Sequence, residues 1–208
     1  MPLLVVSFLF NCSNNKFSLN WSHIEYNPEV IRINSTLTHT DDADKDKEGA
    51  RKLFGASYIA KNDTVIPYRI YRPSEHTNRK LPLVLMMHGA GEHGTDNKKQ
   101  LTWCTLSTFE KYSDLMFNSI VIVPQSFDDN WTWIAPHTPK QCYVDNIKET
   151  RMLDVVFELV KLYSELPFVD KQRIYVVGLS AGGYAVWELI AKHPNFFAAG
   201  IPMSSGGP

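Results

Sequence analysis

The sequence predicts an α/β fold with a mostly parallel sheet and helices on both faces of that sheet. Two observations favour this class. Short apolar runs rich in β-branched residues recur along residues 81–204, and segments of helical period separate them. With 208 residues, of which 44% are hydrophobic and 12% aromatic, the chain can bury one substantial core. In such a sheet, ligands bind beyond the carboxyl ends of the strands.

The predicted elements begin with a hairpin and continue with alternating strands and helices. Residues 56–73, "ASYIAKNDTVIPYRIYRP", hold two alternating apolar runs about a turn at residues 61–63. Apolar runs with the length and composition of buried strands follow at residues 81–88, 119–125, 173–180 and 198–204. Apolar residues at steps of three and four predict helices over residues 146–166 and 183–192, with a weaker pattern over residues 101–117.

The first fifty residues differ in composition from the remainder. The apolar run from Pro2 to Phe10 is too short to cross a bilayer but fits the core of a secretory signal, although no basic residue precedes it. Cys12 directly after this run is a candidate lipid-attachment site. The following residues are polar and aperiodic, as in a linker. We predict a signal segment and linker over residues 1–50, a folded domain over residues 51–208, and secretion or attachment to the cell envelope; an N-terminal strand in a cytoplasmic protein is the alternative.

Charge and cysteine usage restrict the partners. The chain has 21 basic and 22 acidic residues, which leaves no excess of positive charge for a nucleic-acid backbone. Its three cysteines lack the paired spacing of a zinc site. Cys104 and Cys142 could form a disulfide in an exported protein, and free buried thiols are the alternative. No metal or organic cofactor is implied.

The stretch Gly178-Leu179-Ser180-Ala181-Gly182 has the form G-x-S-x-G and lies between a predicted strand and a predicted helix. In that context the serine occupies a sharp turn that projects its hydroxyl above the sheet, and the glycines keep the turn free of side chains. The helix N-terminus that follows places partial positive charge where an oxyanion would develop. Ser180 is therefore the candidate nucleophile, and the Ala181 N–H is a candidate oxyanion donor.

A second motif, "HGAGEHGTDN" at residues 88–97, begins at the end of the strand predicted for residues 81–88. It therefore lies at the same edge of the sheet as Ser180. The glycines allow bare backbone to face a substrate, and the N–H of Ala90 or Gly91 is the second candidate oxyanion donor.

A metal site at His88, Glu92 and His93 is the competing interpretation of this motif. Their spacing differs from the helical zinc motifs, and the surrounding glycines disfavour a helix. We therefore expect His88 and Glu92 to be structural, bonded to nearby backbone.

The segments "LVLMMHGAGEHGTDN", "VIVPQS" and "DKQRIYVVGLSAGGYAVWELIAKHPNFFAAGIPMSSGG" resemble the esterase and predicted-peptidase branch of the α/β-hydrolases, relatives of polyhydroxybutyrate depolymerases and feruloyl esterases. The similarity covers residues 54–208, and His93 departs from the arginine usual at its position. The resemblance implies a serine carboxyl-ester hydrolase that acts through an acyl-enzyme on an ester substrate. A serine peptidase of the same fold and a non-catalytic binding protein are the alternatives.

The resemblance also implies an acid and a histidine after the nucleophile helix. After Ser180 the sequence has no aspartate, and its one histidine, His193, lies about 18–20 Å away along a helix. His93 and His137 lie on loops near the predicted site but match no base position of the family. We therefore expect an α/β-hydrolase fold that lacks its last strands, and negligible turnover from these residues alone.

Residues 124–145 form a long aromatic segment that leaves a strand at the predicted active edge. Loops of this length in compact domains are usually functional or disordered. Trp131 and Trp133 are candidates for a substrate-binding wall, and a solvent-shielding lid without ligand contact is the alternative.

Overall fold

A computed structural model of the chain describes residues 53–59, 65–71, 73, 75–76, 79–102, 118–127, 133 and 151–206, together with four short strands within residues 5–34. Several sequence predictions lie outside these residues: the lipid site at Cys12, the pairing of Cys104 with Cys142, Trp131, His137 and most of the helix predicted for residues 101–117.

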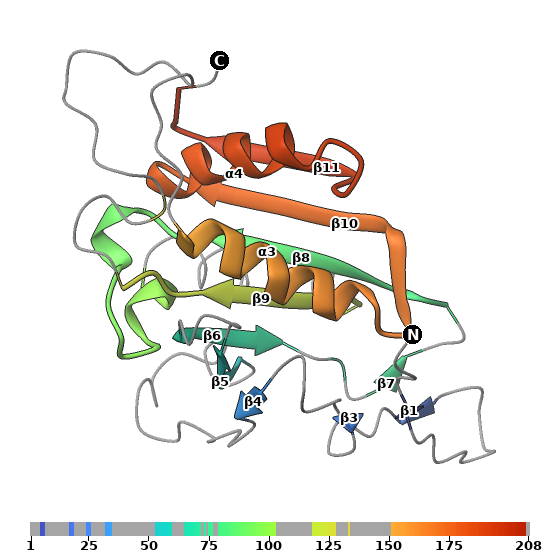
Figure 1. Cartoon of the computed structure of the whole chain (residues 1–208). Helices are drawn as coiled ribbons and strands as arrows, with labels where there is room; N and C mark the ends of the chain where they lie inside the picture. Colours follow the sequence, from blue (N-terminus) through green and yellow to red (C-terminus); the bar gives the residue numbers. More distant parts are fainter. Residues whose placement is uncertain are drawn as a thin grey trace.

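The core of the fold is a seven-stranded sheet with the order β11-β10-β8-β9-β6-β5-β4 (Figure 1). Its parallel part comprises β8 (Leu81–Met87), β9 (Ile120–Pro124), β10 (Val169–Leu179) and β11 (Ala199–Met203). Its antiparallel part comprises β6 (Val65–Tyr71), β5 (Phe54–Ile59) and β4 (Arg32–Asn34). The predicted parallel sheet and the hairpin at its start are therefore confirmed.

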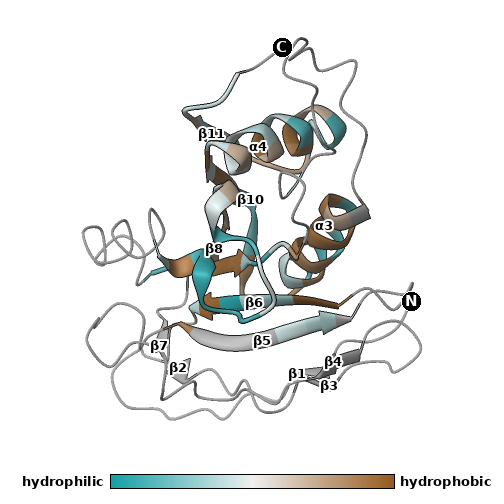
Figure 2. Ribbon diagram, turned by 90° about the vertical axis from the view of Figure 1, so that its left-hand side faces the viewer, coloured by the Kyte–Doolittle hydropathy of each residue, from teal (hydrophilic) through white to brown (hydrophobic). Residues whose placement is uncertain are grey.

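The helices α3 (Arg151–Ser164) and α4 (Ala181–Lys192) lie side by side on one face of the sheet (Figure 2). Their apolar residues and that face of the sheet form the larger buried cluster, which includes Val156, Leu159, Val176 and Ala185. A smaller cluster on other strand residues includes Val121, Val123 and Leu101, the last from the 3₁₀ helix η4 (Lys99–Leu101). Burial on both faces explains why β9, whose five residues are all buried, is a continuous apolar run in the sequence.

Short strands from the first residues add to the main domain. β4 extends the sheet next to β5, although it comes from the segment that composition assigned to a linker. β2 (Phe17–Ser18) pairs with β7 (Glu75–His76), and β1 (Val5–Val6) pairs with β3 (Ile24–Glu25). Among the residues described, no helix is long and apolar enough to cross a bilayer.

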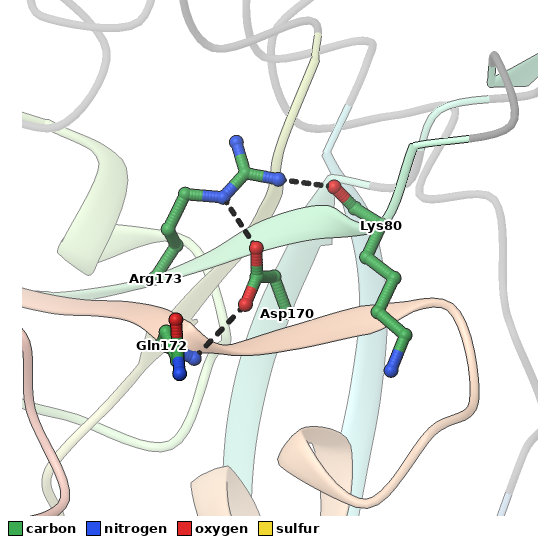
Figure 3. A network of polar contacts seen from close by, with 4 residues as sticks. All are labelled: Lys80, Asp170, Gln172 and Arg173. Carbon is green, nitrogen blue, oxygen red and sulfur yellow. Dashed lines mark hydrogen bonds and ion pairs between the residues drawn. The ribbon is translucent and has the colours of Figure 1, made fainter.

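The start of β10 is polar and irregular. The pairing of β10 with β8 shifts register between Val169 and Ile174. Asp170 accepts hydrogen bonds from Arg173 Nε at 2.7 Å and from the Gln172 N–H at 3.0 Å, and Arg173 also donates to the Lys80 carbonyl (Figure 3). This network holds the polar beginning of β10 beside β8. As a result β10 begins at Val169, four residues before the apolar run that predicted the strand.

Candidate active site

Ser180 occupies a sharp turn between β10 and α4. Its backbone angles are φ 54° and ψ −115°, and it is one of the few non-glycine residues with positive φ in the described structure. Such a conformation is costly for a residue with a Cβ, so the surroundings must hold it. The Ser180 N–H donates to Met203 O at 2.8 Å, and Ser180 O accepts from the Gly183 N–H at 2.8 Å. The turn is therefore fixed from both sides, and Ser180 is exposed.

Glycines at 178 and 182 allow α4 to begin against the end of the sheet. A Cβ on Gly178 would lie 2.3 Å from Gly182 O, and one on Gly182 would lie 2.1 Å from Met87 O. Both contacts are with backbone, which cannot move aside as a flexible side chain can. The steric role that the motif predicts for these glycines is therefore confirmed.

Residues 88–91, His-Gly-Ala-Gly, are called the HGAG segment below. This segment lies directly beside Ser180. A Cβ on Gly89 would lie 3.9 Å from the Ser180 Cβ and 3.5 Å from Leu179 O. Residues Ala90–Glu92 form a 3₁₀ helix, η3, that begins at this point. The two motifs identified in the sequence thus meet at one edge of the sheet, as predicted.

The buried side chains of His88 and Glu92 are bonded to the backbone of this segment. The Ser126 N–H donates to His88 Nε2 at 2.9 Å, so His88 Nδ1 carries the proton and donates to Gly89 O at 2.7 Å. Burial lowers the pKa of His88 to about 4, against the opposing effect of its bond to Gly89 O. The Gly89 N–H donates to Glu92 Oε2 at 2.8 Å. Both side chains are bonded to backbone, which confirms the structural roles expected for them.

The structure corrects the role suggested for Trp133. Its side chain is 0% exposed, and its indole N–H donates to His88 O at 2.9 Å. The ring also lies against the His88 ring, with centroids 4.7 Å apart. Trp133 therefore supports the HGAG segment from inside and has no surface to offer a substrate. Its expected partner in a substrate wall, Trp131, lies outside the described residues.

The described histidine rings have other partners than Ser180. Both nitrogens of His88 are occupied, and His93 Nδ1 lies 2.6 Å from Ala90 O. His193 follows the far end of α4, where its ring stacks on Phe157 with centroids 3.4 Å apart. The twelve residues of α4 separate it from Ser180 by roughly 18 Å.

Gln125, which the sequence analysis did not identify, connects the end of β9 to the loop after the HGAG segment. Its side chain is 0% exposed. Nε2 donates to Asp96 Oδ1 at 2.8 Å and to Glu92 O at 3.3 Å, and Oε1 accepts from the Asn97 N–H at 2.6 Å. The available signal was its position directly after a buried strand, at the edge where Ser180 lies.

The strand order, the strained Ser180 turn and the adjacent glycine segment are those of an α/β-hydrolase fold. Comparisons with known proteins agree. Residues 143–205 match the sequence profile of the prolyl oligopeptidase family. A thermostable esterase of known structure is similar over 76% of this chain and 42% of its own, with 30% sequence identity and a TM-score of 0.64.

Two further structures support the fold alone because their identity to this chain is low. A ferulic acid esterase is 16% identical with a TM-score of 0.50, over 74% of this chain and 58% of its own. An S-formylglutathione hydrolase from Staphylococcus aureus is 15% identical with a TM-score of 0.50, over 74% of this chain and 57% of its own. A search of curated protein sequences found no match.

The chain has an α/β-hydrolase fold, and its similarities are to an esterase and to a peptidase family. It spans less than half the length of the thermostable esterase.

Proposed function

We propose that the protein is a serine carboxyl-ester hydrolase in which Ser180 is the nucleophile. The observation that carries the proposal is the exposed residue Ser180 on a turn of φ 54°, beside the backbone of Gly89. Strained backbone of this kind occurs where the surrounding structure over-determines it, often at active sites. Similarity to a thermostable esterase favours esters as the substrate class.

In the proposed reaction, Ser180 Oγ attacks the ester carbonyl carbon and gives its proton to a general base. The tetrahedral intermediate collapses, the alcohol leaves with a proton, and the acyl group remains as an ester on Ser180. Water then attacks this acyl-enzyme with the same base accepting its proton. The carboxylic acid is released and Ser180 Oγ is protonated again.

Backbone N–H groups stabilise the oxyanion in this proposal. Ala181 is the first residue of α4, and Ala90 and Gly91 begin η3. First-turn N–H groups have no acceptor within their own helix, so they are available to a ligand. The Gly89 N–H is excluded because it donates to Glu92. We assign the hole to Ala181 together with Ala90 or Gly91.

The general base and its acid partner are assigned to no described residue. The rings of His88 and His193 are engaged elsewhere, and His93 is bonded to Ala90 O. Loss of the catalytic histidine in subtilisin costs about 10⁶ in kcat. In this proposal the general base and its acid partner therefore come from outside the described residues.

The test measures the hydrolysis of p-nitrophenyl acetate by the natural gene product. We expect the natural product to hydrolyse it and Ser180→Ala to lose about 10⁴-fold or more of kcat. Ser164→Ala is the matched control, because it removes a serine hydroxyl bonded only to Lys161 O within α3. Hydrolysis that survives Ser180→Ala would rule out the proposed nucleophile.

A peptidase is the second candidate, because the match to the prolyl oligopeptidase family spans residues 143–205 and includes Ser180. The same nucleophile and oxyanion donors would serve an amide carbonyl. Matched p-nitrophenyl ester and p-nitroanilide substrates separate the two. A kcat/KM for the anilide equal to that for the ester would favour the peptidase.

A further inference from the structure

The segment after β8 lies between two neighbouring strands. β10 and its Ser180 turn are on one side, and the end of β9 is on the other, because β8 is the central strand of the three. Gly89 borders Ser180. On the β9 side, the Ser126 N–H donates to His88 Nε2 at 2.9 Å and Ser126 O accepts from the Gly94 N–H at 2.7 Å. The residues that follow β9 therefore hold the segment on the side away from Ser180.

Gln125 provides the side-chain part of this support. Its own N–H is bonded to Pro67 O on β6 at 2.8 Å, which fixes its backbone to the sheet. Its amide then reaches the loop at Glu92, Asp96 and Asn97. One fully buried side chain therefore joins the rigid sheet to both ends of the turn that follows η3.

We propose that Gln125 is a positioning residue for the oxyanion segment, defined as residues 89–91, and that it sets the distance of the Ala90 and Gly91 N–H groups from Ser180. The inference rests on the proposed function. Because Gln125 is 0% exposed, it acts in this proposal through the loop it holds and not by contact with a substrate. Oxyanion donors are effective only when they are fixed near the position that the oxyanion will occupy.

Only an amide satisfies all the partners of Gln125. The Asn97 N–H requires an acceptor, whereas Glu92 O and Asp96 Oδ1 both require a donor. Burial tends to raise the pKa of Asp96, but hydrogen bonds from Gln125 and from the Lys98 and Lys99 N–H groups outweigh burial and lower it. Asp96 is therefore a carboxylate at neutral pH, and a carboxylate at position 125 would face a like charge.

The first test is Gln125→Leu in the natural gene product. The variant leaves the Asn97 N–H and Glu92 O without their partner, and the oxyanion segment is free to shift. Removal of a whole oxyanion donor costs about 100- to 1,000-fold in kcat, so displacement should cost about 10- to 100-fold. KM should change less than about threefold, because the donors act mainly in the transition state. A kcat equal to wild type would overturn the proposal.

Val123→Ala is the matched control for lost stability. Val123 is a fully buried residue of β9, the strand that Gln125 follows, and contributes to the smaller apolar cluster. The Val123→Ala substitution should lower the melting temperature and leave kcat within about twofold of wild type. An equal kcat loss in both variants would show that general destabilisation explains the Gln125→Leu result.

Gln125→Glu supplies a readout that a merely structural role would not change. The charged or titratable groups around position 125 come from five places: Glu92 of η3, Asp96 of the loop, Lys99 of η4, Arg69 of β6 and His88 at the end of β8. At pH 8 the new carboxylate repels Asp96, and at pH 5.5 a shared proton restores one hydrogen bond. The kcat ratio of variant to wild type should rise about fivefold or more from pH 8 to pH 5.5, while the Gln125→Leu ratio stays flat. A flat ratio near one for Gln125→Glu would contradict the inference.

Amide hydrogen exchange tests the same inference without turnover. In Gln125→Leu, exchange over residues 89–97 should be about tenfold faster or more, while β8 and β10 keep their protection. Unchanged exchange would overturn the inference even if no Ser180-dependent hydrolysis is found. If the wild type shows no Ser180-dependent hydrolysis but amide exchange is faster in Gln125→Leu, the proposed function is rejected and the positioning role is retained.

Discussion

At the scale of single residues, the absence of a side chain at position 182 determines whether α4 can start where it does. A Cβ there would lie 2.1 Å from Met87 O and 2.8 Å from His88 O. We expect Gly182→Ala to lower the free energy of unfolding by about 3 kcal/mol or more, because the helix would have to move away from β8. Urea denaturation measures this change.

Gly91→Ala is the matched control for Gly182→Ala. No atom lies within 4 Å of a Cβ built on Gly91, and its φ is not positive. The expected change in unfolding free energy is within about 0.5 kcal/mol. Equal destabilisation by the two variants would show that the close approach at Gly182 is not what limits the turn.

The residues differ in how far the sequence reveals them. Ser180 and Gly182 are recognisable because a fixed spacing coincides with a change from strand to helical period. Trp133 lies in an aperiodic stretch, and its burial depends on the carbonyl of His88, forty-five positions earlier. Such a tertiary partner leaves no local pattern, so an exposed aromatic wall was the natural but incorrect expectation.

At the scale of elements, His88 ties the carboxyl ends of β8 and β9 through its bond from the Ser126 N–H. This bond requires an unprotonated Nε2. Burial lowers the pKa of His88 from 6.5 to about 4 in the folded protein. Between these values the unfolded chain binds a proton that the folded protein does not, so stability falls as pH decreases through this window. The loss should total about 3 kcal/mol and be complete below about pH 4.

Urea unfolding of wild type and His88→Gln between pH 4 and pH 8 isolates this contribution. Glutamine can accept from the Ser126 N–H but does not titrate. The difference in unfolding free energy between the two proteins should shrink as the pH falls from 6.5 to 4. Other titrating groups contribute equally to both proteins. One of them is His193, whose pKa is also lowered by burial and by the charge of Lys192. A difference independent of pH would contradict the prediction.

The sequence predicts a strand well where both of its faces are covered. It does not predict strand residues that are polar, or single polar residues whose partners are distant in the sequence. The run at residues 81–88 predicted β8 to within one residue, because its residues are buried or half-buried on both faces. β10 begins at Val169, before the predicted residue 173, because Asp170, Lys171 and Gln172 hide the strand in the sequence. Gln125 was missed because a single amide after a strand has no periodicity, and its partners are about thirty positions away.

At the scale of the whole molecule, β11 has a strand partner on one side only among the described residues. Ile201 in the middle of this edge strand is 56% exposed. An apolar strand edge of this kind is a template for pairing with another chain. We expect the 208-residue chain to self-associate at micromolar concentration, and Ile201→Lys to reduce the association by placing a charge on the edge.

Val65→Lys is the matched control, because Val65 is 47% exposed but belongs to β6, which has neighbours on both sides. Both substitutions remove one exposed β-branched residue and add one positive charge, so a general gain in solubility would appear in both. Pairing through the β11 edge predicts a lower average mass in light scattering for Ile201→Lys alone. A monomeric wild-type chain would show that this edge is already protected, and equal effects of the two variants would assign the association to surface hydrophobicity and not to the open strand.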